Sequence, residues 1–119
     1  MHTEQPQNIA PNALPEVITR YLEAHRGKDT AAALGAFHSD ATVTDEGRVH
    51  RGALAIETWL TRSAGEYTYT IELTGALKID TTHYVATHHL EGNFPGGVVD
   101  LHYRFTLSEG LIQGLLIEP

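Results

Sequence analysis

Two segments of alternating side chains, 84–91 and 98–107, stand on either side of Phe94-Pro95-Gly96-Gly97. A β-strand points alternate side chains to opposite faces, so this pattern predicts a hairpin with one apolar face and one polar face. Proline at the second position of a turn and glycine at the third favour a type II turn. Because type II is not the usual hairpin turn, a looser loop stays possible.

The hydrophobic pattern also predicts which residues face each other across this hairpin. With Phe94 paired to Gly97, the inner pairs are Tyr84–Leu107, Ala86–Phe105, His88–Tyr103 and Leu90–Leu101. The outer pairs are Thr87–Arg104, His89–His102 and Glu91–Asp100. A slip of one residue would exchange the faces of one strand and bury charges, which favours this register.

The other segments complete an α+β pattern. Helical spacing of apolar residues begins at Leu14 and ends at Gly27, Asp29 is suited to cap a second helix, and Gly52 opens a third. The apolar stripe expected on the third helix is Leu54, Ile56, Trp59 and Leu60. Segments 67–74 and 111–117 predict two further strands. We therefore expect a cone: a curved antiparallel (mixed) sheet with three N-terminal-half helices on its concave face and a pocket at the wide end.

The length of 119 residues suits one domain, which we place at 13–119 behind a flexible arm at 1–12. A net charge of -7 argues against nucleic acid and against an anionic membrane surface as partners. The sequence has no cysteine, no apolar run of membrane-spanning length and no signal-peptide pattern at its start. A soluble, cytoplasmic protein is the expectation.

Asp45 lies in the segment that most constrains function. Strand alternation places it on the same face as Ala41 and Val43, and a carboxylate that faces an apolar interior needs a partner. The alternative is an aspartate of an ordinary turn, because Asp-Glu-Gly is common in turns. The pattern leaves both interpretations open.

The order of three motifs resembles a known family. The run F-x-x-D-A-x-V-x-D at 37–45, R-G-x-x-A-I at 51–56 and the aromatic Trp59 resemble the SnoaL-like and ketosteroid isomerase-like group of the nuclear transport factor two-like superfamily. The likeness extends from about Val17 to the C-terminus. It implies that Asp45 is a general base, that Tyr21 donates to a developing oxyanion and that no cofactor is needed. The family's second oxyanion donor is an aspartic acid, and Leu101 stands at that position here.

His88 is the one imidazole on the predicted inner face. It could replace the missing acid, or pair with Asp45 to activate water or a substrate C–H bond. The alternative is a core histidine that Tyr103 or the backbone satisfies. The residues expected to line the substrate pocket are Trp59, Tyr84, Leu101, Tyr103 and Phe105.

The outer face carries residue types that bind divalent metals: His89, Glu91, Asp100 and His102. Opposed carboxylates repel unless something lies between them, and a polar dimer interface explains the set more economically. We therefore expect no metal, and a homodimer formed through Thr87, His89, His102 and Arg104.

Two functions fit this sequence. The first is a small cofactor-independent enzyme, an isomerase or cyclase, that moves a proton on an apolar carbonyl compound of polyketide-like or steroid-like type. The second is a module of the same fold that binds a small apolar ligand, or dimerises, without catalysis.

Overall fold

The alternating segments of the sequence form the middle of the sheet. In this computed structural model, which describes residues 6–119, they are β4 (Tyr69–Lys78), β5 (His83–Gly92) and β6 (Val98–Ser108). The first five residues, part of the predicted arm, lie outside the described range. Tyr84, Ala86, His88 and Leu90 are buried along β5, so its inner face is the one that the alternation predicts.

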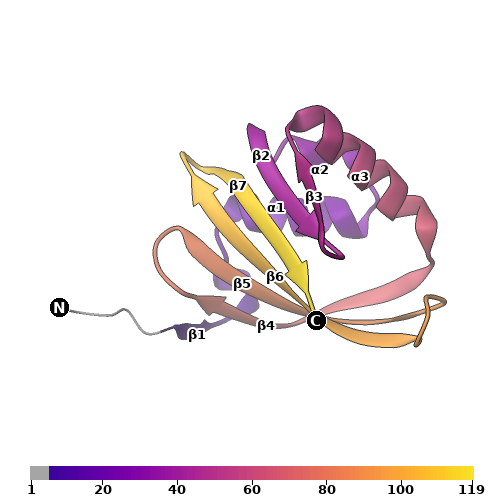
Figure 1. Ribbon diagram of the computed structural model, residues 1–119. Helices are drawn as coiled ribbons and strands as arrows, with labels where there is room; N and C mark the ends of the chain where they lie inside the picture. The colour runs from indigo at the N-terminus through magenta and orange to yellow at the C-terminus, as the bar shows by residue number, and fades with distance from the viewer. Residues whose placement is uncertain (1–5) are drawn as a thin grey trace.

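Four more strands complete the sheet of the described chain: β1 (Gln7–Ile9), β2 (Phe37–Asp45), β3 (Arg48–Arg51) and β7 (Leu111–Glu118). The strand order is β1-β4-β5-β6-β7-β2-β3, and the sheet does not close into a barrel. The pair β2–β7 is parallel, and the other neighbouring pairs are antiparallel. Figure 1 shows the strong curvature of this sheet.

The helices α1 (Glu16–Arg26), α2 (Thr30–Leu34) and α3 (Ala53–Glu66) lie together on one side of the sheet (Figure 1). A short 3-10 turn, Pro11–Ala13, precedes them. The Asp29 carboxylate accepts a hydrogen bond from the Ala32 amide at 3.1 Å and so caps α2. The α+β class with three helices on a mixed, open sheet is confirmed.

The apolar stripe of α3 is shorter than the sequence predicts. Ile56, Trp59 and Leu60 are buried, whereas Leu54 is 79% exposed. Residues at i, i+3 and i+4 share one helix face, and Leu54, two positions before Ile56, lies outside it. The largest fully buried side chains of the described residues are Ile18, Tyr21, Val43, Ile56, Phe105 and Ile112.

The predicted hairpin register is wrong by two residues. Ala86 pairs with Tyr103, and His88 pairs with Leu101. Phe94 and Gly97 do close the expected turn, with a hydrogen bond of 3.0 Å and Gly96 at φ 90, but that turn sits inside a longer loop. A shift of two keeps every side chain on its face, so the inner and outer faces are as predicted.

The cause of the longer loop is Asn93. Its backbone N–H donates to Thr68 O at 3.1 Å, and its side-chain oxygen accepts from the Thr68 amide at 2.9 Å. Asn93 therefore bonds to the start of the neighbouring strand, and the β5–β6 ladder closes at Gly92 and Gly97 instead.

Residues 7–9 of the predicted flexible arm form the short strand β1. Gln7, Asn8 and Ile9 pair with Lys78, Leu77 and Ala76 of β4, and Ile9 packs against the core. A strand of three residues is too short for a recognisable alternation. No helix among the described residues is long and apolar enough to cross a membrane.

Candidate functional site

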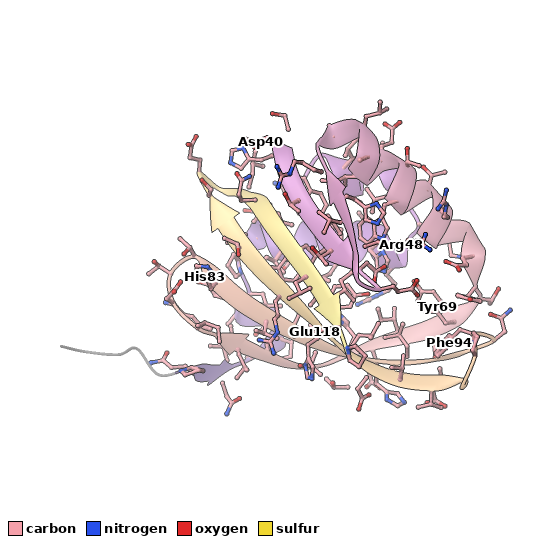
Figure 2. The ribbon with its side chains drawn as sticks, in the orientation of Figure 1. Asp40, Arg48, Tyr69, His83, Phe94 and Glu118 are labelled. Carbon is pink, nitrogen blue, oxygen red and sulfur yellow. The ribbon has the colours of Figure 1, made fainter. Side chains whose placement is uncertain are left out.

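The wide end of the cone holds a cavity of about 760 Å³. Its walls come from α1, β2, α3, the central strands and the C-terminal residues. Among the side chains that line it are His25, Asp45, Trp59, Tyr69, Leu101 and Tyr103. Figure 2 shows Tyr69 and Phe94 at the end of the molecule where the β5–β6 loop lies, and both line this cavity.

Asp45 is the last residue of β2, and its side chain lines the cavity. The turn that follows it has positive φ at Glu46 and Gly47, 53° and 74°. The residue is therefore both a strand residue and the neighbour of a turn. The carboxylate is half-buried and accepts a hydrogen bond from Trp59 Nε1 at 3.1 Å. That bond supplies the partner that a carboxylate in an apolar setting requires.

An aromatic wall stands next to this carboxylate. The Tyr69 hydroxyl lies 3.4 Å from His25 Nε2, and the centroids of the His25 and Tyr103 rings are 6.2 Å apart. On its other side His25 stacks on Tyr21, at 5.8 Å and an interplanar angle of 14°. Two phenols and one imidazole are thus fixed by mutual packing on the cavity wall.

Burial determines the protonation of these groups. It lowers the pKa of His25, and the charge of Asp45 opposes that shift. It raises the pKa of Tyr69, with Asp45 adding to the effect, and raises the pKa of Tyr103, with Tyr69 and Asp45 adding to it. At neutral pH the wall therefore presents these three hydrogen-bonding groups in their neutral forms.

Tyr21 does not line the cavity, although the family resemblance gives it the role of oxyanion donor. It is completely buried, between Phe37 and Phe105, and its hydroxyl has no hydrogen-bond partner among the residues that the structure describes. Burial, and then the neighbouring Tyr103 and Asp45, hold the pKa of Tyr21 well above its usual value. The donor role of Tyr21 stays a prediction.

His88 faces a different space from Asp45. It lines a second pocket of about 170 Å³, on the α1 side of β4, and is 3% exposed. Its ring packs edge-on against Tyr103 at 4.5 Å, and its Nδ1 has no partner within residues 6–119. Burial, followed by the charges of His25 and Arg26, lowers the pKa of His88 to about 4. No hydrogen bond joins His88 to Asp45 in the described structure. The core-histidine alternative expects a partner that Nδ1 lacks among these residues, so the role of His88 stays a prediction.

The other predicted pocket residues divide into two groups. Trp59, Leu101 and Tyr103 line the main cavity, whereas Tyr84 and Phe105 do not. Tyr84 and Phe105 pair with each other and belong to the buried core. Both residues lie on the predicted inner face of the hairpin. Core side chains pack against them there, so they do not reach the cavity.

His25 is the cavity residue that sequence reasoning missed, since it reads as a surface histidine near a helix end. The signal that could have found it is its spacing from Tyr21, because residues at i and i+4 lie on the same helix face. His25 lines both the main cavity and the second pocket.

The outer sheet face has its own polar pairs. His89 lies 2.7 Å from Asp100 and 3.0 Å from Glu91, and these two carboxylates raise the pKa of His89. His102 Nδ1 lies 2.9 Å from the Thr87 hydroxyl. Residues 6–119 contain no group of three or more histidine, aspartate or glutamate side chains that could hold a metal ion.

Comparison with solved structures places the chain among known relatives. A candidate polyketide cyclase from Sinorhizobium meliloti is 32% identical, over 92% of this chain and 100% of that one, with a TM-score of 0.85. No family model and no curated protein matches the sequence.

Two more distant structures share the fold. One is a protein of ketosteroid isomerase-like fold from Catenulispora acidiphila, in complex with trimethylamine. It is 20% identical, with a TM-score of 0.76, over 88% of this chain and 85% of that one. The other is the Δ5-3-ketosteroid isomerase of a Mycobacterium species. It is 17% identical, with a TM-score of 0.70, over 87% and 89%.

Proposed function

Because the chain belongs to the SnoaL-like and ketosteroid isomerase-like group of the nuclear transport factor two-like superfamily, we propose that it moves a proton on an apolar carbonyl compound. The observation that supports this most directly is the Asp45 carboxylate, held by Trp59 at 3.1 Å in the wall of a cavity of about 760 Å³. Cavities of this size take small organic ligands.

In the proposed step the Asp45 carboxylate removes a proton from the carbon next to the substrate carbonyl. The C–H electron pair forms a C=C bond, and the carbonyl π pair moves to oxygen, where neutral hydrogen-bond donors stabilise the charge. Asp45 then returns the proton to a different carbon, which is isomerisation. Alternatively, the carbanion attacks a second carbonyl of the same molecule, whose π pair moves to its oxygen and takes the proton back from Asp45, which is cyclisation. A base and hydrogen-bond donors suffice, so the step needs no cofactor.

The cavity walls support the proposed substrate class. Leu90, Val99, Leu101 and Ile117 provide apolar surface, and Trp59, Tyr69 and Tyr103 provide rings. A flat, apolar, polycyclic ketone of polyketide-like or steroid-like type would bury its skeleton there and direct one oxygen to the phenols.

A second candidate is a non-catalytic binding protein of the same fold. One observation favours it: Leu101 lines the cavity where the family resemblance implies an acidic donor. An apolar residue there suits ligand retention better than enolisation.

Deuterium exchange separates the two candidates without knowledge of the substrate. The bicyclic ketone 2-tetralone carries acidic hydrogens next to its carbonyl, and their replacement in D2O is followed by NMR. We expect the protein to accelerate the exchange, and Asp45→Asn to lose roughly 10²–10⁴-fold of that acceleration. Asparagine can still accept the Trp59 hydrogen bond, so ligand binding, measured by quenching of the single tryptophan, should persist.

Asp40→Asn is the matched control, since Asp40 is an exposed aspartate of the same strand. It should leave the exchange unchanged. If bound 2-tetralone exchanges equally fast in the wild-type protein and in the Asp45→Asn variant, the result would favour the binding protein instead.

A further inference from the structure

The cavity contains hydroxyl groups that the family resemblance does not use. The hydroxyl of Tyr21 has no hydrogen-bond partner in the described part of the chain and lies in the core. Tyr69 and Tyr103, by contrast, both line the cavity that holds Asp45. The two differ in their surroundings, because only the hydroxyl of Tyr69 has an imidazole nitrogen as its neighbour, at 3.4 Å, among the described contacts.

We propose that Tyr69, positioned by His25, is the hydroxyl that donates to the substrate oxygen while Asp45 acts on the neighbouring carbon. This inference rests on the function proposed above and deepens it by assigning the oxyanion donor. The first residue of β4 thereby takes the role that the family resemblance gives to Tyr21 in α1.

His25 is held so that its Nε2 meets Tyr69. Its ring stacks on Tyr21 at 5.8 Å, almost parallel at 14°, and lies 6.2 Å from the Tyr103 ring. Tyr21 in turn packs edge-on against Phe37 at 5.3 Å and Phe105 at 5.9 Å. The orientation of the imidazole is therefore tied to the core, and it restricts where the Tyr69 hydroxyl can lie.

The protonation of the pair suits donation. With its hydrogen on Nε2, the neutral imidazole donates to the Tyr69 oxygen, and the Tyr69 hydrogen is then free to point at the substrate. As the C–H bond breaks and charge collects on the carbonyl oxygen, this chain of two hydrogen bonds stabilises it. No proton leaves Tyr69 or His25: the only proton transferred is the one that Asp45 takes and returns.

An oxyanion that resembles the enolate tests this directly. 2-Naphthol has different fluorescence in its neutral and ionised forms, so the ionised fraction of the bound molecule reports on the donors around its oxygen. All proteins in this test carry Asp45→Asn, which removes the competing negative charge and imitates the protonated base. Because no turnover is measured, the result does not depend on whether the protein is an enzyme.

We expect Tyr69→Phe to weaken naphtholate binding roughly ten- to hundred-fold, which is the range for one hydrogen bond to a charged group. The ionised fraction of bound naphthol should fall with it. Tyr84→Phe is the matched control, since it removes the same hydroxyl from a core tyrosine that does not line the cavity; it should change neither quantity.

The positioning role of His25 has its own comparison. Phenylalanine can stack on Tyr21 but cannot donate to Tyr69, whereas glutamine carries an amide N–H at the place of Nε2. His25→Phe should lower the ionised fraction, and His25→Gln should restore part of it. In a protein that already carries Tyr69→Phe, His25→Phe should have little further effect.

Three results would overturn the proposal. The first is an ionised fraction that Tyr69→Phe leaves unchanged and Tyr103→Phe abolishes. The second is equal behaviour of His25→Phe and His25→Gln. The third is binding of naphthol by the Asp45→Asn protein only in its neutral form. If Tyr69 controls naphtholate binding while Asp45→Asn leaves the deuterium exchange intact, the donor assignment stands and the proposed function falls.

Discussion

Trp59 Nε1 donates a hydrogen bond to Asp45 Oδ2 at 3.1 Å, across 14 residues of sequence. The bond joins the end of β2 to the middle of α3, and both partners line the main cavity. An indole N–H is a donor only, so it holds the carboxylate without competing with it for a proton. The second carboxylate oxygen takes no part in this bond and stays available for a substrate C–H.

Trp59→Phe keeps an aromatic ring but removes this donor. We expect the free energy of unfolding to fall by roughly 1.5–3 kcal/mol, as for a hydrogen bond to a charged group. The deuterium exchange of 2-tetralone should slow by roughly ten- to a hundred-fold, because the base is no longer aligned. Chemical denaturation and NMR measure the two effects. Unchanged exchange would mean that the indole serves packing alone.

Leu101→Asp introduces the acid that the family resemblance implies. Burial and the negative charge of Asp45 both raise the pKa of a carboxyl group at this position, so it should stay protonated and donate. We expect exchange of 2-tetralone to become about tenfold faster, as for one added hydrogen bond in the transition state. Val99→Asp, on the same strand and the same cavity, is the positional control. Slower exchange in Leu101→Asp would contradict the expectation.

His88 should weaken the protein in acid. Its folded pKa is lowered to about 4 by burial, with His25 and Arg26 adding to the effect, so below about pH 6.5 the unfolded chain binds a proton that the folded chain refuses. Stability therefore falls as the pH drops from about 6.5 towards 4. His88→Phe, which can keep the edge-on contact with Tyr103, should gain about 2 kcal/mol on wild type between pH 7.5 and roughly pH 5. Chemical denaturation at both pH values measures this gain. The same difference in free energy of unfolding between the two proteins at pH 7.5 and at pH 5 would disprove the prediction.

His89 should show the opposite dependence. Asp100 and Glu91 raise its folded pKa, so its contribution to stability is fully present below about pH 6.5 and is lost as the pH rises through the raised value. NMR titration of the His89 ring should give a pKa above the ordinary value, and Asp100→Asn should bring it down. If Asp100→Asn leaves the pKa of His89 unchanged, the 2.7 Å contact between the two side chains is absent in solution.

The outer sheet face should form a homodimer in solution. Thr87, His89, His102 and Arg104 lie together on the strands β5 and β6, and Arg104 bonds to Glu118 at 2.7 Å. Thr87→Arg places a long cation among them and should give a monomer by light scattering at micromolar concentration. Arg62, an exposed residue of α3, provides the control substitution Arg62→Ala. Wild-type protein that is itself monomeric would rule the interface out.

Alternation was a sound guide to faces and a poor guide to register. It placed His88 and Tyr103 inward, and both are buried. It could not reveal that Asn93 bonds to Thr68 of another strand, because a bond between segments 25 residues apart leaves no local pattern. The error of two residues follows from that single contact.

The candidate site was predictable only in part. The strand pattern of β2 placed Asp45 on the inner side, and the cavity does contain it. The pairing of His25 with Tyr69, in contrast, joins α1 to β4 across 44 residues. Only the packing of that helix on the sheet brings the two rings together, so periodicity within either element could not show it.

The short strand β1 covers only Ala76, Leu77 and Lys78 of β4. Towards Tyr69, the outer edge of β4 meets no other strand among residues 6–119, and an open edge is a template on which a second chain can add. The register of β4 against β5 shifts between Leu73 and Gly75, next to the residues that β1 covers. This shift interrupts the regular strand edge at the point where the pairing with β1 ends. Deleting β1 would leave all ten residues of β4 uncovered, and aggregation through strand addition is the damage we would expect to see first.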